Sequence, residues 1–187
     1  GIWDTAAARA RRSGPDADPD AYFPPRELVS YILDRPALFP AGEGYHYTDT
    51  GYIVAGLILE AASGGAFYDE AQRRVLDPMG LTLTEAQIGR RFDNLASGYL
   101  GTDDNVYELP DKIAEDGVVA FNMLTEWTGG GYISNSKDLA RWGKAFYDGS
   151  ALPTPYLEEM LSSGYRGEDA ESIYGISVFL VDNELGR

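Results

Sequence analysis

The segment from Thr48 to Gly65 constrains the fold of this chain more than any other part of its sequence. Thr48 or Asp49 can cap a helix at its N-terminus, and Ser63-Gly64-Gly65 can end that helix. Between these ends, apolar side chains cover nearly the whole circumference of a helix from about Thr50 to Ala62; they are Tyr52, Ile53, Val54, Leu57, Ile58 and Leu59. Because a helix that is apolar on all sides must be enclosed by other elements, the sequence predicts a buried helix.

Other helices and short strands are indicated on both sides of this segment. Pro24 and Pro25 suit the start of a helix whose body is Arg26 to Leu33, and Pro36 suits its end. The remaining expected elements are a polar helix over 67–76, a short strand over 132–134, a helix capped by Ser136 with Leu139, Trp142, Gly143 and Phe146 on one face, and a helix over 154–162. Residues 89–128 are too rich in Gly and Asp for a continuous helix, so loops and short strands are expected there.

The apolar run at residues 174–181 reads Tyr-Gly-Ile-Ser-Val-Phe-Leu-Val and predicts a strand. A strand needs neighbours to pair with, and little chain follows this one. The first residue is Gly1 and not Met. We therefore expect one partial domain over 1–187, a piece of a larger protein, with a helical region at about 20–165 and a strand at 166–187 that returns to a sheet. The unpaired edge of that strand is an expected site of association or aggregation.

Composition excludes several classes of function. The 187 residues are 44% apolar, enough for a sizeable core, and 30 acidic against 15 basic side chains give a net charge of -15. That charge argues against a broad nucleic-acid or anionic-membrane surface. Zero cysteines exclude disulfides and cysteine nucleophiles, and the single histidine, His46, excludes a multi-histidine metal site. No apolar run approaches the roughly 20 residues of a membrane span.

Two motifs suggest ion sites only weakly. Residues 16–27 place acidic side chains at the spacing of a calcium loop, but Ala21 stands where that loop needs Gly, and prolines interrupt the frame. A solvated acidic loop is the preferred interpretation. Three glycines at 129–131 lack the Gly-Lys-Ser/Thr of a phosphate loop, and a tight turn before a strand explains them better.

The sequence contains no Gly-x-Ser-x-Gly motif of an α/β-hydrolase, but Ser134-Asn-Ser-Lys137 matches Ser-x-x-Lys. In that motif the lysine activates the serine, which requires both side chains on one helix face, a turn apart. Here the helix is expected to begin at Ser136, so Ser134 lies outside that geometry. A strand end followed by a helix cap is the preferred interpretation of this motif.

Four stretches of the chain carry a further pattern: Phe39-Pro-Ala-Gly42 with Tyr45-His-Tyr47-Thr-Asp49 and the helix to Glu60; Val75-Leu-Asp-Pro-Met-Gly-Leu81; Thr128 to Trp142; and Tyr174-Gly-Ile-Ser-Val-Phe179. In order and spacing they resemble the serine β-lactamase and penicillin-binding protein family, which includes class C β-lactamases, DD-carboxypeptidases and related esterases. The resemblance implies an α+β, β-lactamase/transpeptidase-like fold, mainly its helical region plus a few strands. It also implies an incomplete fold, because the family's Ser-x-x-Lys nucleophile and its Lys/His-x-Gly strand find no counterpart here.

The resemblance assigns roles to two residues. Tyr47 matches the family's catalytic tyrosine, a general acid or base for the serine and the leaving group, whereas an ordinary half-buried aromatic is the alternative. Asp49 stands where the family most often has Asn, and its carboxylate would repel a carboxylate on a substrate. Capping of the following helix is the alternative role for Asp49. His46 is interpreted as a bystander.

The resemblance therefore implies the central part of a serine hydrolase that forms and hydrolyses an acyl-enzyme from an amide, β-lactam or ester. It implies a small-molecule or peptide substrate, no metal or organic cofactor, and an extracytoplasmic (periplasmic or secreted) location. A tyrosine with a pKa of about 10 is a poor base at neutral pH unless nearby cations lower it. Because the family takes those lysines from the two motifs without a counterpart, we expect this chain alone to be inactive. A non-catalytic binding or scaffold module and a carboxylate-pair hydrolase such as a glycosidase remain as alternatives.

Overall fold

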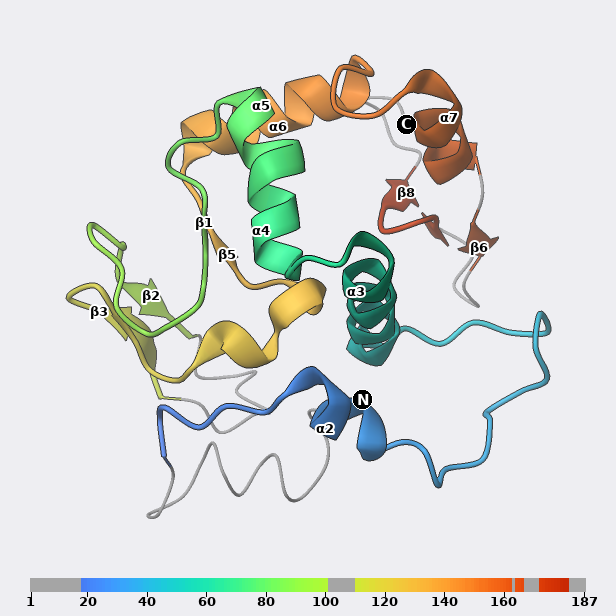
Figure 1. Cartoon of the computed structure of the whole chain (residues 1–187), viewed down its shortest axis with the longest axis horizontal. Helices are drawn as coiled ribbons and strands as arrows, with labels where there is room; N and C mark the ends of the chain where they lie inside the picture. The colour runs from blue at the N-terminus through green and yellow to red at the C-terminus, as the bar shows by residue number, and fades with distance from the viewer. Residues whose placement is uncertain (1–17, 101–109, 163, 167–171, 182–187) are drawn as a thin grey trace. The chain divides into compact units, whose positions relative to one another are not determined.

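The computed structural model describes residues 18–100, 110–162, 164–166 and 172–181 (Figure 1). These residues form two structural units. The first takes its described residues from the chain up to 36 and from 48–70 and 85–133, and the second from 37–47, 71–84 and the chain from 134 onward. The first residues of the acidic calcium-like motif and the last six residues of the chain lie outside the described part.

The core of the first unit is built where two helices meet a turn. Helix α2 (Pro25–Ser30) and helix α3 (Asp49–Ser63) pack together, and the short helical turns η4 (Met123–Thr125) and η5 (Trp127–Gly129) follow one another along the chain, with η5 against α3 (Figure 1). The buried side chains of this core are Phe23, Leu28, Ile53 and Trp127. Each contributes about 1.5–3 kcal/mol through removal from water. Helix α2 starts where the two prolines predicted, but it ends at Ser30, before Leu33.

Helix α3 has the caps that the sequence predicts. The Thr48 side chain accepts a hydrogen bond from the Thr50 N–H (3.2 Å), and Gly64 ends the helix with φ 73°, its N–H donating to the Glu60 carbonyl. The expectation that α3 is buried on all sides is wrong. One face is buried, with Ile53 2% exposed, but Ile58 on another face is 63% exposed. An apolar circumference alone therefore did not determine burial.

Glycine at position 56 allows α3 to lie directly on η5. A Cβ at Gly56 would come within 2.3 Å of Thr128 Cγ2 and 2.9 Å of Trp127 Cζ3. Thr128 is itself held, because its hydroxyl donates to the Tyr52 carbonyl at 2.7 Å. Neither neighbour can withdraw without loss of a hydrogen bond or of core packing, so the close approach requires glycine.

Short strands complete the first unit. Strand β1 (Glu85–Ala86) pairs with β5 (Tyr132–Ile133), and β2 (Gly98–Tyr99), β3 (Lys112–Glu115) and β4 (Val118–Val119) form an antiparallel sheet in that order. Strands β2, β3 and β4 confirm the prediction of short strands within 89–128, whereas the helical turns η4 and η5 near its end were not predicted. Asp20, from the acidic motif, accepts a hydrogen bond from Arg90 at 3.3 Å, so it serves as an ion-pair partner.

The second unit contains η2 (Gln72–Leu76), a π-helical turn, and α5 (Asp77–Met79), which continue the helical stretch that α4 (Phe67–Ala71) begins and that Gly80 ends with φ 63°. It also contains α6 (Ser136–Tyr147), on which α5 packs, and α7 (Thr154–Ser162). The cap of α6 is Asn135 and not Ser136 as expected: the Asn135 side chain accepts hydrogen bonds from the backbone N–H groups of Lys137 and Asp138. On the expected apolar face, Phe146 is buried but Leu139 is 58% exposed.

A buried carboxylate holds the start of α6. Asp138 is 2% exposed and accepts hydrogen bonds from the Leu83 N–H (2.8 Å) and from the Thr84 hydroxyl (3.2 Å). The Arg141 guanidinium lies 3.6 Å from its other oxygen. Since a buried charge is tolerated only with such partners, Asp138 fixes the chain at residues 83–84 against α6.

The apolar run at 174–181 is not one strand, and that expectation is corrected. Strands β6 (Tyr165–Arg166), β7 (Ser172–Tyr174) and β8 (Phe179–Val181) form an antiparallel sheet with β7 in the centre. The chain reverses between β7 and β8, where Ser177 has φ 62° and the Gly175 N–H donates to the Val178 carbonyl at 2.8 Å. Phe179 on β8 is 66% exposed, and association along this edge remains a prediction.

No single helix among the described residues is long and apolar enough to cross a membrane; α3 and the helical stretch Phe67–Met79 pass that test only as a pair, bent by 76°.

Two tyrosines of the first unit bury their hydroxyl groups. The rings of Tyr68 and Tyr132 meet edge to face at 5.6 Å, and neither hydroxyl has a hydrogen-bond partner among the described residues. Burial raises the pKa of Tyr132 to about 12. Burial, followed by the charges of Tyr132, Tyr22 and Glu126, raises the pKa of Tyr68 further. Both side chains are therefore held as neutral phenols.

Two glycine-to-alanine substitutions in α3 should have opposite effects. Gly56→Ala should lower the free energy of unfolding by about 1–3 kcal/mol, because overpacking against Thr128 exceeds the gain in helix propensity. Gly51→Ala is the matched control: apart from its chain neighbours and the backbone of its own helix, no atom lies within 4 Å of a Cβ there. It should raise the free energy of unfolding by up to about 1 kcal/mol. Urea unfolding followed by circular dichroism measures both, and a stabilised Gly56→Ala would contradict the packing described.

The tyrosine pair should make the first unit sensitive to alkali. In the unfolded chain Tyr132 ionises near the ordinary pKa of 10.0, and in the fold near 12. Between these values the folded state binds more protons than the unfolded state. The contribution of Tyr132 to the free energy of unfolding is therefore fully present below pH 10 and falls as the pH rises toward 12. Tyr132→Phe should weaken this loss. At neutral pH it should leave stability unchanged or raise it by up to about 1 kcal/mol, since it removes an unpaired buried hydroxyl.

The control for that measurement is Tyr156→Phe, at a ring that is 60% exposed, which should retain the wild-type pH dependence. If Tyr132→Phe and the wild type lose the same free energy of unfolding between pH 10 and 12, the Tyr132 hydroxyl is not responsible for the sensitivity to alkali.

Candidate functional site

Tyr47 lies in a segment, residues 37–47, that has neither helix nor strand. Its side chain is 48% exposed, so it is accessible to a ligand. Its ring meets the ring of Tyr174, at the end of β7, at a centroid distance of 5.7 Å and an angle of 88°. Tyr45 contacts the same Tyr174 ring at 5.4 Å, and Phe179 on β8 contacts it at 4.7 Å. The four rings form an aromatic cluster within the second unit, with Tyr174 in contact with each of the others.

Asp49 is the first residue of α3, in the first unit, and is half-buried. The cap of the helix is Thr48, so capping does not account for the aspartate. In the first turn its carboxylate lies at the positive end of the helix dipole. The backbone of the glycine turn passes beside it, since a Cβ at Gly129 would lie 3.6 Å from Asp49 Cβ. Thr48 alone separates Asp49 from Tyr47 in the sequence, and His46 is exposed.

The Ser134–Lys137 pair does not have the geometry of a catalytic serine and lysine. Ser134 precedes the cap of α6, whereas Lys137 lies in the first turn of that helix. The Ser134 hydroxyl lies 2.8 Å from the Thr84 hydroxyl, and Lys137 is exposed. This confirms the expectation that the two residues do not share a helix face. Ser134 therefore acts as a hydrogen-bonding partner at the end of a strand.

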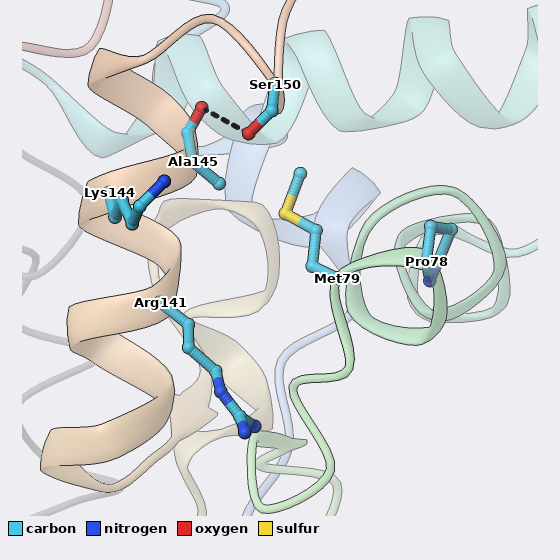
Figure 2. Close-up of a pocket in the computed structure, with 6 residues that line it drawn as sticks. All are labelled: Pro78, Met79, Arg141, Lys144, Ala145 and Ser150. Atoms are coloured by element: carbon cyan, nitrogen blue, oxygen red, sulfur yellow. Dashed lines mark hydrogen bonds between the residues drawn. The ribbon is translucent and has the colours of Figure 1, made fainter.

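A cavity of about 350 Å³ lies between α5 and α6 in the second unit (Figure 2). It is lined by Pro78, Met79, Arg141, Lys144, Ala145 and Ser150. Both of its cations have carboxylate partners. Arg141 donates to the Gly80 carbonyl at 3.0 Å and lies beside Asp138, and Lys144 donates to Asp148 at 2.5 Å. With its charges paired in this way, the cavity does not select strongly for an anion.

Ser150 is the nucleophile candidate of this cavity. Its hydroxyl donates to Asp148 Oδ1 at 2.6 Å and lies 3.4 Å from the Ala145 carbonyl, as Figure 2 shows for the second contact. Hydrogen bonds from Lys144, and then from Ser150, hold the pKa of Asp148 well below its ordinary value. A carboxylate of such low basicity does not remove a proton from serine, so Ser150 is not activated.

Metal binding has no support in the described residues: no group of three or more His, Asp or Glu side chains there could hold an ion. What the sequence did not reveal is the contact of Tyr47 with Tyr174. Both residues lie in recognisable motifs, but nothing in the spacing of those motifs indicates that the two rings meet.

Comparisons with known proteins agree with the motifs. The family model described as beta-lactamase matches residues 5–183. Penicillin-binding protein 4* of Bacillus subtilis (strain 168) is 30% identical over 172 residues, which are 87% of this chain and 38% of that protein. The serine beta-lactamase-like protein LACTB, mitochondrial, of Homo sapiens is 27% identical over 123 residues, which are 66% of this chain and 21% of that protein.

Solved structures show the same fold. A D-stereospecific amidohydrolase from Streptomyces sp. superposes with a TM-score of 0.78 at 20% identity, covering 100% of this chain and 54% of that one. The D-amino acid amidase from Ochrobactrum anthropi SV3, complexed with L-phenylalanine amide, superposes with a TM-score of 0.70 at 22% identity, covering 87% of this chain and 46% of that one. The chain thus spans about half the length of these solved structures, and less of the curated relatives.

The order of the four motifs, the α+β fold shared with these structures and a family match over most of the sequence lead to one conclusion: this chain belongs to the beta-lactamase family.

Proposed function

We propose that the chain forms the tyrosine-bearing part of a serine hydrolase of the β-lactamase type, with Tyr47 as its general acid and base. The observation that carries the proposal is the position of Tyr47. It directly precedes the Thr48 cap of α3, in the family's tyrosine motif, and its side chain is 48% exposed. Tyr68 and Tyr132, in contrast, have buried hydroxyls with no partner among the described residues and could not reach a substrate.

The reaction is acyl transfer. A serine hydroxyl attacks the carbonyl carbon of an amide or ester, and its proton passes to the base. The carbon–nitrogen or carbon–oxygen bond then breaks, and the acid returns a proton to the leaving group. Water hydrolyses the acyl-enzyme in the second half of the reaction. In this scheme Tyr47 accepts the first proton and donates the second.

A basic tyrosine needs a nearby cation, and two of the chain's three lysines have carboxylate partners of their own. Lys112 pairs with Glu115, and Lys144 pairs with Asp148. The third, Lys137, lies in the first turn of α6 without the helix-face geometry required with Ser134. We therefore infer that the nucleophile and its lysine come from a Ser-x-x-Lys outside residues 1–187, as in the family.

The negative charge of Asp49 favours some classes of substrate over others. A carboxylate at the position where the family most often has Asn disfavours substrates with a carboxylate near the scissile bond, such as penicillins. It favours neutral substrates and those with a free ammonium group. Amides of amino acids fit this requirement, and two of the structures with this fold are named for an amidase and a D-stereospecific amidohydrolase. We propose amide hydrolysis ahead of β-lactam hydrolysis.

Covalent labelling tests the proposed division of the site. Residues 1–187 alone should form no adduct with a fluorophosphonate or a fluorescent penicillin. The protein expressed from the uninterrupted native reading frame that encodes them should be labelled by the fluorophosphonate. In that protein Tyr47→Phe should slow the labelling about 100-fold or more. Tyr156→Phe, at an exposed ring, is the control. An adduct on a serine of residues 1–187, or full labelling of Tyr47→Phe, would refute the proposal.

Replacement of Asp49 should change substrate preference. In the protein from the native reading frame, Asp49→Asn removes the negative charge but retains the shape. It should raise the rate of acylation by a penicillin about 10-fold relative to that by a neutral ester. Asp69→Asn, at an exposed residue of α4, makes the same charge change and should leave this ratio as it is. An unchanged ratio in Asp49→Asn would show that Asp49 does not select against carboxylates.

A further inference from the structure

We propose that Tyr174 is a positioning residue for Tyr47: its ring holds the catalytic ring in place from the central strand of a sheet. The inference rests on the proposed role of Tyr47 and extends it to a residue far away in the sequence. Tyr174 meets the ring of Tyr47 edge to face at 5.7 Å and 88°. Edge-to-face pairs at this distance are attractive beyond the area that they bury.

A support from outside matters for Tyr47 because its own segment has no regular secondary structure. Residues 37–47 have neither helix nor strand, and the Tyr47 side chain is 48% exposed. A side chain on such a segment samples several rotamers unless packing selects one. Proton transfer requires the hydroxyl within hydrogen-bond reach of the serine and of the leaving group, so a freely moving ring would be a slow catalyst.

Tyr174 is held firmly enough to provide that support. It lies on β7, which pairs with β6 on one side and with β8 on the other, in register with Tyr165 and Phe179. Phe179 packs on its ring at 4.7 Å and Tyr45 at 5.4 Å. The ring of Tyr174 is therefore confined by a strand neighbour and by a second residue from the Tyr47 segment, and Tyr47 packs on a support that is itself fixed.

The contact works through the ring of Tyr174, and this separates two substitutions. Tyr174→Phe retains the ring and should retain the position of Tyr47. Tyr174→Leu removes the ring and should release Tyr47, and Tyr174→Met replaces it as the test variant if Tyr174→Leu does not fold. Tyr156→Leu, at a tyrosine of α7 that is 60% exposed, is the matched control.

The first measurement concerns mobility and does not depend on activity. In residues 1–187 with ¹³C-labelled tyrosine, NMR relaxation gives the order parameter of each ring, and Tyr47→Phe identifies the signals of Tyr47. Tyr174→Leu should lower the order parameter of the Tyr47 ring to that of a flexible side chain and leave that of Tyr132 unchanged. Tyr174→Phe and Tyr156→Leu should leave both as in the wild type.

The second measurement is acylation by a neutral ester in the protein from the native reading frame. Tyr174→Leu should lower kcat about 10- to 100-fold with little change in KM, and Tyr174→Phe should remain within about 3-fold of wild type. In Tyr47→Phe, the further change Tyr174→Leu should cost nothing more, because the ring that it positions no longer carries the hydroxyl.

The outcomes distinguish this inference from the function on which it rests. If Tyr47→Phe retains full activity, the proposed function is wrong. If Tyr47→Phe is inactive while Tyr174→Leu keeps wild-type kcat and ring order, the proposed function stands and the positioning role is refuted. Loss of activity in Tyr174→Phe equal to that in Tyr174→Leu would also refute it, because the hydroxyl and not the ring would then be responsible.

Discussion

The close approach of α3 to the η5 turn is the contact on which the first unit depends. It exists because position 56 carries no side chain, so that Trp127 and Thr128 lie directly on the helix. Trp127 thereby joins Phe23 and Leu28 in one core. The same contact determines where the three glycines after Trp127 run, which is beside Asp49 at one end and beside Tyr68 at the other. The absence of a side chain at Gly56 thus lets the glycine turn lie against the first turn of α3, where Asp49 is proposed to have a functional role.

Two contacts of different character stabilise the described part of the second unit. Asp138 is a buried carboxylate whose hydrogen bonds join residues 83–84 to α6, and a buried charge of this kind fixes geometry because few arrangements satisfy it. Tyr174 makes its contacts through an aromatic ring, which tolerates more variation and depends on shape. The polar contact fixes a structural junction. The aromatic contact supports a residue to which a chemical role is assigned.

Local rules predicted much of the fold, and non-local packing explains what they missed. The cap of α3 at Thr48 and its end at Gly64 follow from the conformations that those residues prefer, as does the start of α7 at Thr154. The reversal between β7 and β8 was missed because the run at 174–181 is mostly apolar, and the residue with positive φ is Ser177, where glycine would have signalled a turn. The exposure of Ile58 was missed because a helical pattern indicates which side chains are apolar but not how many neighbours will cover them.

The candidate site was predictable only as far as its motif extends. Tyr47 and Asp49 came from the family pattern around the start of α3, and their roles remain predictions. Tyr174 lies in another of the four motifs, but its role beside Tyr47 did not come from that motif, because the contact arises when a sheet near one end of the sequence meets a loop from its first third. No local periodicity or spacing encodes such a meeting.

The tyrosines of this chain show why surroundings, more than residue type, decide which phenol can take part in proton transfer. Burial raises the pKa of Tyr132 to about 12, so this phenol keeps its proton at neutral pH, and its hydroxyl is buried away from solvent. Tyr47 has a side chain that is half in contact with solvent and half against other rings. Packing can orient such a ring, but rings do not lower the pKa of a phenol as cations do. The orientation of the Tyr47 ring and the basicity of its hydroxyl therefore depend on different neighbouring groups. The aromatic cluster of Tyr45, Tyr47, Tyr174 and Phe179 can provide the orientation, and under the proposed function a lysine beside the nucleophilic serine provides the basicity.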